Sequence, residues 1–437
     1  MWSLHITNTG FKWEQVVPQG RRQPSPRWQT GDTTAFGTSL VIYGGDDKNT
    51  SQVGALGDLW VYTPRPKDTS VKPAQGLADE WQNLVRGGVQ PGPRREPSLT
   101  MLNGTLLLQG GKMVDGEMNE QCDSGLFLLN ILDDQAEWRK GSPLPGACGV
   151  GQTMHRVSIP HAEGSKQRAV VFGGCQWSVE GTYVCSDDLH AYDIEEDSWE
   201  TLTPKSDEDA YACACETTRH FACLPFLPYS MARLSVNSAV QAEHQESASL
   251  RKRSGKKGGK ASKSAAVCPG QTRPRPLGRH SHATAYVESI AESLHALFVF
   301  GGRETEDALI PLGDLWMFDF NSMRWSEITP DSRKRPNNRF GHSLSVSHKQ
   351  YTIDKRAQKS RTSSPTDLSY FVLCLTCVCV CVCVCVCIWQ GGAGDGVAGL
   401  VVFGGQTMGR TGQSIYMNDV WLYTPHTGKW REVSHIG

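Results

Sequence analysis

One short pattern recurs along this chain and constrains its fold more than any other feature. A run of apolar residues ends in a pair of glycines five times. The pairs are Gly44-Gly45, Gly110-Gly111, Gly173-Gly174, Gly301-Gly302 and Gly404-Gly405. A sequence that repeats in this way builds an array of similar units, and each unit buries its faces only against its neighbours. The repeats therefore decide the architecture before the composition does.

Two further elements follow each glycine pair in the same order. The first is an Asp-Leu/Val-aromatic segment or a variant of it, at Asp58-Leu59-Trp60, Gly125-Leu126-Phe127, Asp188-Leu189-His190, Asp314-Leu315-Trp316 and Asp419-Val420-Trp421. The second is a closing tryptophan, at Trp81, Trp138, Trp199, Trp325 and Trp430, with a further one at Trp13. The aromatic and the closing tryptophan are 9 residues apart in the last two copies, which fits two short strands joined by a tight turn.

The residue types in each copy suit a sheet that is covered on both faces. Val401, Val402 and Phe403 form a short continuous apolar run, which is typical of a strand buried on both sides. Glycine after such a strand allows a positive φ or a close approach of another backbone. A tryptophan in the last strand offers a large apolar surface to the adjacent unit. The sequence thus predicts an all-β array of packed sheets.

This order of apolar run, Gly-Gly, aromatic and tryptophan resembles the kelch repeat. The resemblance implies a kelch-type β-propeller with one four-stranded blade for each repeat of about 50 residues. Five full blades are expected at residues 27–85, 94–139, 150–202, 279–329 and 339–434. In residues 1–18, Trp2 and Trp13 are 11 residues apart, as are Phe127 and Trp138. These residues match strands three and four of another blade, so we expect a half blade of an incomplete six-bladed ring; the alternative is an N-terminal tail over residues 1–25.

Two insertions interrupt the repeats. Residues 203–275 contain charged, cysteine-rich and basic stretches with little apolar content, which predicts disorder in much of the segment. Residues 347–398 fall between the first and second strands of the last blade. They contain YFVLCLTCVCVCVCVCVCIW at 370–389, which is long and apolar enough for a transmembrane helix.

A membrane span at 370–389 would place two strands of one blade on opposite sides of a bilayer, where they could not pair. Strict Cys-Val alternation is also what translation of a TG dinucleotide repeat produces. We therefore interpret this run as a translated non-coding repeat, such as a retained intron, and expect no membrane partner. If it is made, an exposed run with this β propensity favours aggregation.

Composition limits the kinds of partner and the cellular compartment that are expected for this chain. The net charge of −1 over 437 residues argues against nucleic acid as the partner. The N-terminus shows no basic segment followed by an apolar one, so no secretory signal is expected. Seven of the 15 cysteines lie between Cys374 and Cys387, and the other eight are scattered without a framework. This favours a reducing, cytoplasmic location; the basic tract at 251–263 is typical of a solvated linker or a nuclear-import signal.

One group of thiols and an imidazole has residue types that bind zinc. Cys213, Cys215, His220 and Cys223 form C-x-C-x₄-H-x₂-C. The spacing matches no established zinc finger, and a loop with free thiols is the simpler interpretation. We therefore expect neither a metal nor another cofactor.

Recurring arginines are the candidates for partner-binding loops. Arg27, Arg95, Arg279 and Arg339 open four blades, with Thr30, Ser98, His282 and His342 three residues later. Such pairs either tie neighbouring loops together or bind carboxylates and phosphates of a partner. Further loop candidates follow the glycine pairs, at Asp46, Lys112, Arg303 and Gln406.

The resemblance implies a non-catalytic scaffold or adaptor that presents propeller loops to a protein or peptide. One alternative is a copper radical oxidase resembling galactose oxidase, for which His282, His342 and Tyr416 offer ligand types. Such enzymes are secreted and need a Cys-Tyr pair, which cannot be singled out here. Another alternative is the propeller fragment of a larger kelch protein with a phosphatase or ubiquitin-ligase adaptor domain. Common catalytic motifs such as the P-loop and Gly-x-Ser-x-Gly are absent from the sequence.

Overall fold

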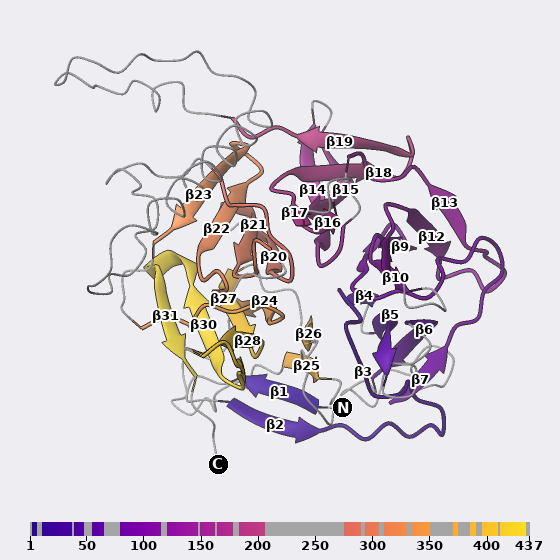
Figure 1. Ribbon diagram of the computed structural model, residues 1–437, viewed down its shortest axis with the longest axis horizontal. Coiled ribbons are helices and arrows are strands. Elements are labelled where there is room, and N and C mark those ends of the chain that lie inside the picture. Colours follow the sequence, from indigo (N-terminus) through magenta and orange to yellow (C-terminus); the bar gives the residue numbers. More distant parts are fainter. Residues whose placement is uncertain are drawn as a thin grey trace, which may run out of the picture. The chain divides into compact units, whose positions relative to one another are not determined.

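Five antiparallel sheets stand around a common centre in the computed structural model (Figure 1). The structure describes residues 2–6, 11–36, 39–47, 55–64, 79–114, 120–146, 149–161, 164–177, 183–205, 275–289, 293–305, 310–329, 334–349, 370–374, 385–389, 396–409 and 411–433. These belong to a unit formed by residues 1–205 and 273–437. A second unit, 206–272, lies outside the described residues, as does most of the insertion that was expected to be disordered.

Each of the five sheets is a blade whose strands follow one another from the centre outwards. Blade one contains β3 (Arg27–Trp28), β4 (Thr34–Phe36), β5 (Ser39–Asp47), β6 (Leu56–Thr63) and β7 (Glu80–Asn83). Blade two contains β8 (Ser98–Leu102), β9 (Thr105–Gln109), β12 (Leu126–Asn130) and β13 (Arg139–Gly141). Blade three contains β14 (Thr153–His161), β15 (Gly164–Phe172), β18 (Leu189–Asp193) and β19 (Ser198–Leu202).

The last two blades repeat the same order. Blade four contains β20 (Ala283–Ser289), β21 (Leu294–Phe300), β22 (Leu315–Asp319) and β23 (Arg324–Ile328). Blade five contains β24 (Ser343–Lys349), β27 (Gly396–Phe403), β30 (Val420–Thr424) and β31 (Lys429–Glu432). The described residues form one helix, a short 3₁₀ helix at Pro425–Thr427. The predicted all-β propeller with five blades is thereby confirmed.

Apolar clusters fill the spaces between successive blades, which explains why the second strands read as continuous apolar runs. Leu107 and Leu128 of blade two pack with Val171 of blade three, for example. Closing tryptophans reach across these interfaces to the residue just before a glycine pair. The ring centroids of Phe172 and Trp325 are 5.3 Å apart, and those of Phe300 and Trp430 are 5.4 Å apart.

The N-terminal residues form a two-stranded sheet of β1 (Trp2–Ile6) and β2 (Phe11–Gln15). Leu4 pairs with Trp13 in this sheet just as Tyr423 pairs with Trp430 in the outer strands of blade five. Leu4 is buried against Val401 of blade five, and the rings of Trp13 and Phe403 are 5.0 Å apart. The hairpin thus takes the position of the outer half of a further blade.

Four smaller hairpins complete the described strands. They are β10 (Lys112–Val114) with β11 (Glu120–Cys122), β16 (Cys175–Trp177) with β17 (Tyr183–Cys185), β25 (Tyr370–Cys374) with β26 (Cys385–Trp389), and β28 (Gln406–Met408) with β29 (Ser414–Tyr416). The described ends of the Cys-Val run are therefore strands that pair with each other. Within the described ranges, no helix is long and apolar enough to cross a membrane.

Candidate functional site

The arginines at the starts of blades one, four and five are buried inside those blades. Arg339 donates two hydrogen bonds of 2.8 Å to the carboxylate of Asp419 and one of 2.9 Å to the carbonyl of Gly404. Trp421 donates a 2.6 Å hydrogen bond to the same carboxylate. Matching sets are Arg27, Gly44, Asp58 and Trp60 in blade one, and Arg279, Gly301, Asp314 and Trp316 in blade four. These arginines join three strands of one blade and are not available to a partner.

The carboxylates in these sets are held in their charged form. Burial raises the pKa of Asp419, but the hydrogen bonds and the charge of Arg339 lower it more. The hydrogen bond from Trp421 acts in the same direction, so the pKa of Asp419 lies below its ordinary value. The pKa of Asp314 is lowered in the same way by Arg279 and Trp316.

In blade two the structure places Arg94, and not Arg95, at the repeated position. Arg94 is buried and donates to the carbonyl of Gly110 at 2.8 Å and to Asp123 at 2.9 Å. Arg95 instead forms an ion pair of 2.6 Å with Asp46 of blade one. The sequence-based prediction of Arg95 for this position was therefore wrong by one residue. A proline precedes two of the four buried arginines, Arg27 and Arg94, but not Arg279 or Arg339, so no preceding residue common to all four marks the position.

The glycine pairs are contacts between blades. Gly302 donates a 2.9 Å backbone hydrogen bond to the carbonyl of Arg339 in the next blade. A Cβ on Gly301 would lie 2.4 Å from that carbonyl oxygen, and a Cβ on Gly302 would lie 2.7 Å from the Cβ of His282. Equivalent bonds run from Gly45 to Arg94, from Gly111 to Gly149 and from Gly174 to Arg279. Only glycine permits this approach. In blade three, Gly149 occupies the position that an arginine takes in the other blades.

The residues that follow the glycine pairs share one end of the ring, which we call the glycine-pair face. Each pairs with the residue after the repeated arginine position. The pairs are Asp46 with Trp28, Lys112 with Arg95, Cys175 with Val150, Arg303 with His280 and Gln406 with Phe340. The four loop candidates Asp46, Lys112, Arg303 and Gln406 thus occupy equivalent places.

A rim of residues in left-handed conformation surrounds the centre of this face. They are Gln29 (φ 55°), Glu96 (φ 50°), Gly151 (φ 64°), Ser281 (φ 50°) and Gly341 (φ 61°). Backbone hydrogen bonds of 2.8 Å from Ser281 to Gly151 and from Gly341 to Ser281 tie neighbouring blades together there. Because non-glycine residues rarely adopt this conformation, the repeated positive φ indicates a geometry imposed by packing of the blades.

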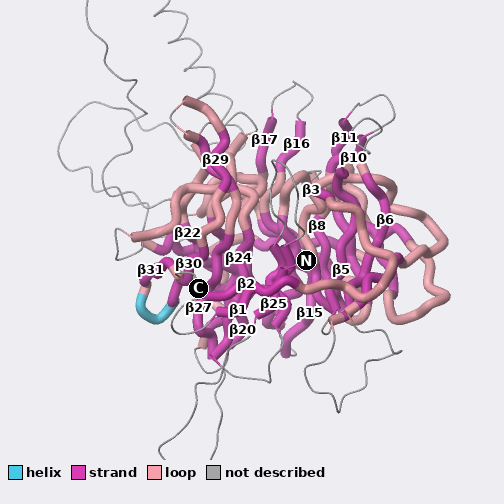
Figure 2. The backbone as a smooth tube through the Cα atoms, turned by 90° about the horizontal axis from the view of Figure 1, so that it is seen from below, coloured by secondary structure: helices cyan, strands magenta, loops and turns pink. Residues whose placement is uncertain are grey.

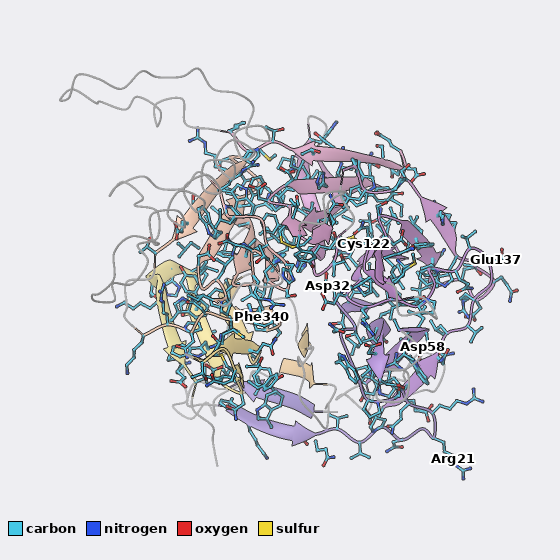
Figure 3. All side chains as sticks on the ribbon, in the orientation of Figure 1. Arg21, Asp32, Asp58, Cys122, Glu137 and Phe340 are labelled. Carbon is cyan, nitrogen blue, oxygen red and sulfur yellow. A yellow bond between two sulfur atoms is a disulfide. The ribbon has the colours of Figure 1, made fainter. Side chains whose placement is uncertain are left out.

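A cavity of about 500 Å³ opens inside the rim and continues between the innermost strands. The guanidinium of Arg303 lies 4.0 Å from the ring centroid of Phe340 at its mouth. Deeper in, His155 and Thr284 share a 2.7 Å hydrogen bond. Figure 3 shows Asp32 and Phe340 on the inner side of the blades. The cavity offers a partner both an aromatic–cation pair and hydrogen-bonding groups.

Hairpins between the second and third strands project from the glycine-pair face. Figure 2 shows β10, β11, β16, β17 and β29 along its upper edge. Val184 on β17, Ile310 between β21 and β22, and Ile415 and Tyr416 on β29 are exposed by 44%, 76%, 43% and 46%. Blades three, four and five therefore each carry an exposed apolar side chain at this end of the ring.

A disulfide joins Cys175 and Cys185 at the base of the β16–β17 hairpin. From the sequence, no disulfide framework was expected for these two cysteines. They meet because β16 and β17 pair in the register that places Cys175 opposite Cys185. Cys122 on β11 is also disulfide-bonded.

Comparison with known protein families finds a match for the N-terminal half of the chain. Residues 1–222 match the KLHDC2/KLHL20/DRC7 Kelch-repeats domain, which is just over half of the 437 residues. The chain belongs to this Kelch-repeat family. Kelch-repeat propellers generally serve as non-catalytic scaffolds for protein interactions.

The ligands considered for a metal do not gather in the described part of this Kelch propeller. His282 and His342 are buried beneath the second glycines of two pairs, whereas Tyr416 is exposed on β29. In the described ranges, no group of three or more His, Cys, Asp or Glu side chains is placed to hold a metal ion. The zinc candidates Cys213, Cys215, His220 and Cys223 lie outside the described residues.

One acid of the Kelch propeller lies on the cavity wall. The Asp32 carboxylate accepts a 2.9 Å hydrogen bond from the backbone N–H of Met154 in blade three. Burial raises the pKa of Asp32 to about 8, although the hydrogen bond from Met154 lowers it. The folded pKa of Asp32 therefore lies well above its unfolded pKa of about 4.

We expect Asp32→Asn to change how stability depends on pH. A folded pKa above the unfolded one gives stabilisation that is complete below about pH 4, declines as the pH rises, and is lost above about pH 8. The melting temperature of Asp32→Asn minus that of the original protein should therefore be larger at pH 8.5 than at pH 5. Thermal unfolding of both proteins at the two pH values measures this, and Asp133→Asn, at an exposed acid, is the control. An equal difference at both pH values would contradict it.

Proposed function

We propose that this Kelch propeller is a non-catalytic scaffold or adaptor that binds a protein or peptide partner at its glycine-pair face. The observation that carries the proposal is the set of exposed apolar side chains on the projecting hairpins beside the cavity mouth. Protein interfaces combine an apolar or aromatic centre with a polar rim. Ile415 and Val184 supply apolar surface, while Lys112 and Arg303 supply charge at the same end.

The buried arginines have no place in this proposal, because their guanidinium groups are engaged by Asp58, Asp314 and Asp419. The proposed contact residues are instead Arg303 and Gln406 at the mouth of the cavity, with Val184 and Ile415 on the hairpins. An aromatic face beneath a guanidinium, as Phe340 beneath Arg303, keeps that charge oriented for a partner.

The test uses the full chain as bait for a random peptide library, followed by measurement of the dissociation constant of a selected peptide. Ile415→Asp should weaken binding about tenfold or more, because it places a charge in an apolar contact. Leu132→Asp is the matched control, since Leu132 is also exposed but lies in the turn after β12, at the other end of the strands. A peptide that is affected by Leu132→Asp and unaffected by both Ile415→Asp and Val184→Asp would overturn the proposal.

A further inference from the structure

Each of the five blades contributes a hydroxyl side chain to the wall of the cavity inside the rim. In the order of the blades, these residues are Thr34, Thr100, Thr153, Thr284 and Ser343. A hydroxyl group can both donate and accept a hydrogen bond. The wall therefore offers hydrogen bonds to a ligand from every blade.

Two of these hydroxyl groups are buried without a hydrogen-bond partner. Thr284 shares its 2.7 Å hydrogen bond with His155. Thr100 and Ser343 are only 5% and 8% exposed, and their hydroxyl groups form no hydrogen bond within the described part of the chain. Because an unpaired hydroxyl in a buried position costs free energy, these two groups favour a ligand that forms hydrogen bonds with them.

Carboxyl and guanidinium groups are few on the cavity wall. Among the described residues that line it, Asp32, Glu96 and Arg303 carry such groups. Glu96 lies on the rim, where it accepts a 3.1 Å hydrogen bond from the side chain of Gln29. Arg303 lies over the ring of Phe340 at the mouth. The charges of Glu96 and Arg303 are therefore at the entrance, and the hydroxyl groups lie along the inner strands.

Burial beside the inner strands disfavours a charge of either sign. It raises the pKa of Asp32 to about 8, against the effect of the hydrogen bond from Met154. It lowers the pKa of His155 to about 4, against the effect of the hydrogen bond with Thr284. Both shifts favour the uncharged form. A charged ligand group that entered to the same depth without a counter-charge would be destabilised for the same reason.

We propose that this cavity binds an uncharged carboxamide side chain, that of Asn or Gln, from the peptide partner. The inference rests on the proposed binding of a peptide at the glycine-pair face. A carboxamide both donates and accepts hydrogen bonds, so it can pair with hydroxyl groups in either role. An apolar side chain would leave the hydroxyls of Thr100 and Ser343 unpaired, and a carboxylate would have to stay at the mouth with Arg303. The volume of about 500 Å³ is within the range of ligand sites.

Two probes of equal size test this selectivity. N-acetylglutamine amide and N-acetylglutamate amide differ in whether the side chain is a carboxamide or a carboxylate. The full chain is titrated with each probe at neutral pH, and the dissociation constants are measured by NMR. The glutamine probe should bind about tenfold more tightly or better. Equal or tighter binding of the glutamate probe, or no binding of the glutamine probe, would overturn the proposal.

A pair of matched variants places the glutamine probe in the cavity. Thr100→Val removes the hydroxyl and keeps the shape of the side chain, so it should weaken binding of the probe about fivefold or more. Thr105→Val makes the same change at the start of β9, outside the described lining of the cavity, and should leave binding unchanged. Equal dissociation constants for the two variants would show that the probe binds elsewhere.

The selected peptides separate this inference from the proposed function. Peptides that bind through Ile415 or Val184 and show no preference for Asn or Gln over Asp or Glu would overturn the carboxamide site alone. Binding of the glutamine probe, together with peptides that are weakened by Leu132→Asp and by neither Ile415→Asp nor Val184→Asp, would overturn the proposed function and retain the carboxamide site.

Discussion

Arg339→Ala should lower the free energy of unfolding by about 3 kcal/mol, the lower end of the range for breaking a buried ion pair. The variant leaves the carboxylate of Asp419 and the carbonyl of Gly404 without the donors that Arg339 supplies. The lower end applies because the Asp419 side chain keeps 24% of its surface exposed, while Arg339 is fully buried. Chemical denaturation of the two proteins measures the difference.

Arg335→Ala is the matched control, because Arg335 is exposed in the same loop and should change stability by less than about 0.5 kcal/mol. The pH dependence supplies a second check. Since the folded pKa of Asp419 is lowered, its stabilising contribution is present above about pH 4 and is lost as the pH falls through the folded pKa. The gap between the original protein and Arg339→Ala should therefore shrink in acid. Equal free energies of unfolding for the two proteins at neutral pH would show that the buried pair contributes nothing to stability.

Gly301→Ala should destabilise the protein much more than Gly428→Ala. Both glycines have φ 64°, so both substitutions carry the left-handed penalty of about 1–2 kcal/mol. At Gly301 the new Cβ would also lie 2.4 Å from the carbonyl oxygen of Arg339, which forces two blades apart. Overpacking of this kind adds about 1–3 kcal/mol.

Gly428 has open space around its Cβ position, so the difference between the two variants isolates the contact between blades. Thermal or chemical unfolding of both variants gives that difference directly. Equal losses in Gly301→Ala and Gly428→Ala would mean that the close approach of Gly301 to the next blade is relaxed at little cost.

The sequence predicted the fold because its signals are local. One repeat alone shows an apolar run that suits a strand covered on both sides. It also shows the glycines that allow a positive φ after this strand, and a tryptophan nine residues beyond an aromatic. The contacts that bury the repeated arginines, and so exclude them from the site, are not local. Arg339 and Asp419 are 80 residues apart, and nothing short of the fold shows that their side chains meet.

Two other features escaped prediction for the same reason. Arg94 and Arg95 are adjacent and chemically identical, so only the carbonyl of Gly110 distinguishes the buried residue from the one at the face. The place of β25 beside β1 could not be predicted either, because the two strands are more than 360 residues apart in the chain. By contrast, Asp46, Lys112, Arg303 and Gln406 could be found from sequence, since each directly follows a glycine pair.

The bond between Cys175 and Cys185 has a consequence for recognition. Val184 lies next to Cys185, so its backbone is anchored at the base of the hairpin before any partner arrives. Immobilising a segment on association costs conformational entropy, and a segment that is already tethered loses less of it. For the proposed contact at Val184, the disulfide therefore lowers the conformational entropy cost of binding. Reduction of the disulfide would raise that cost.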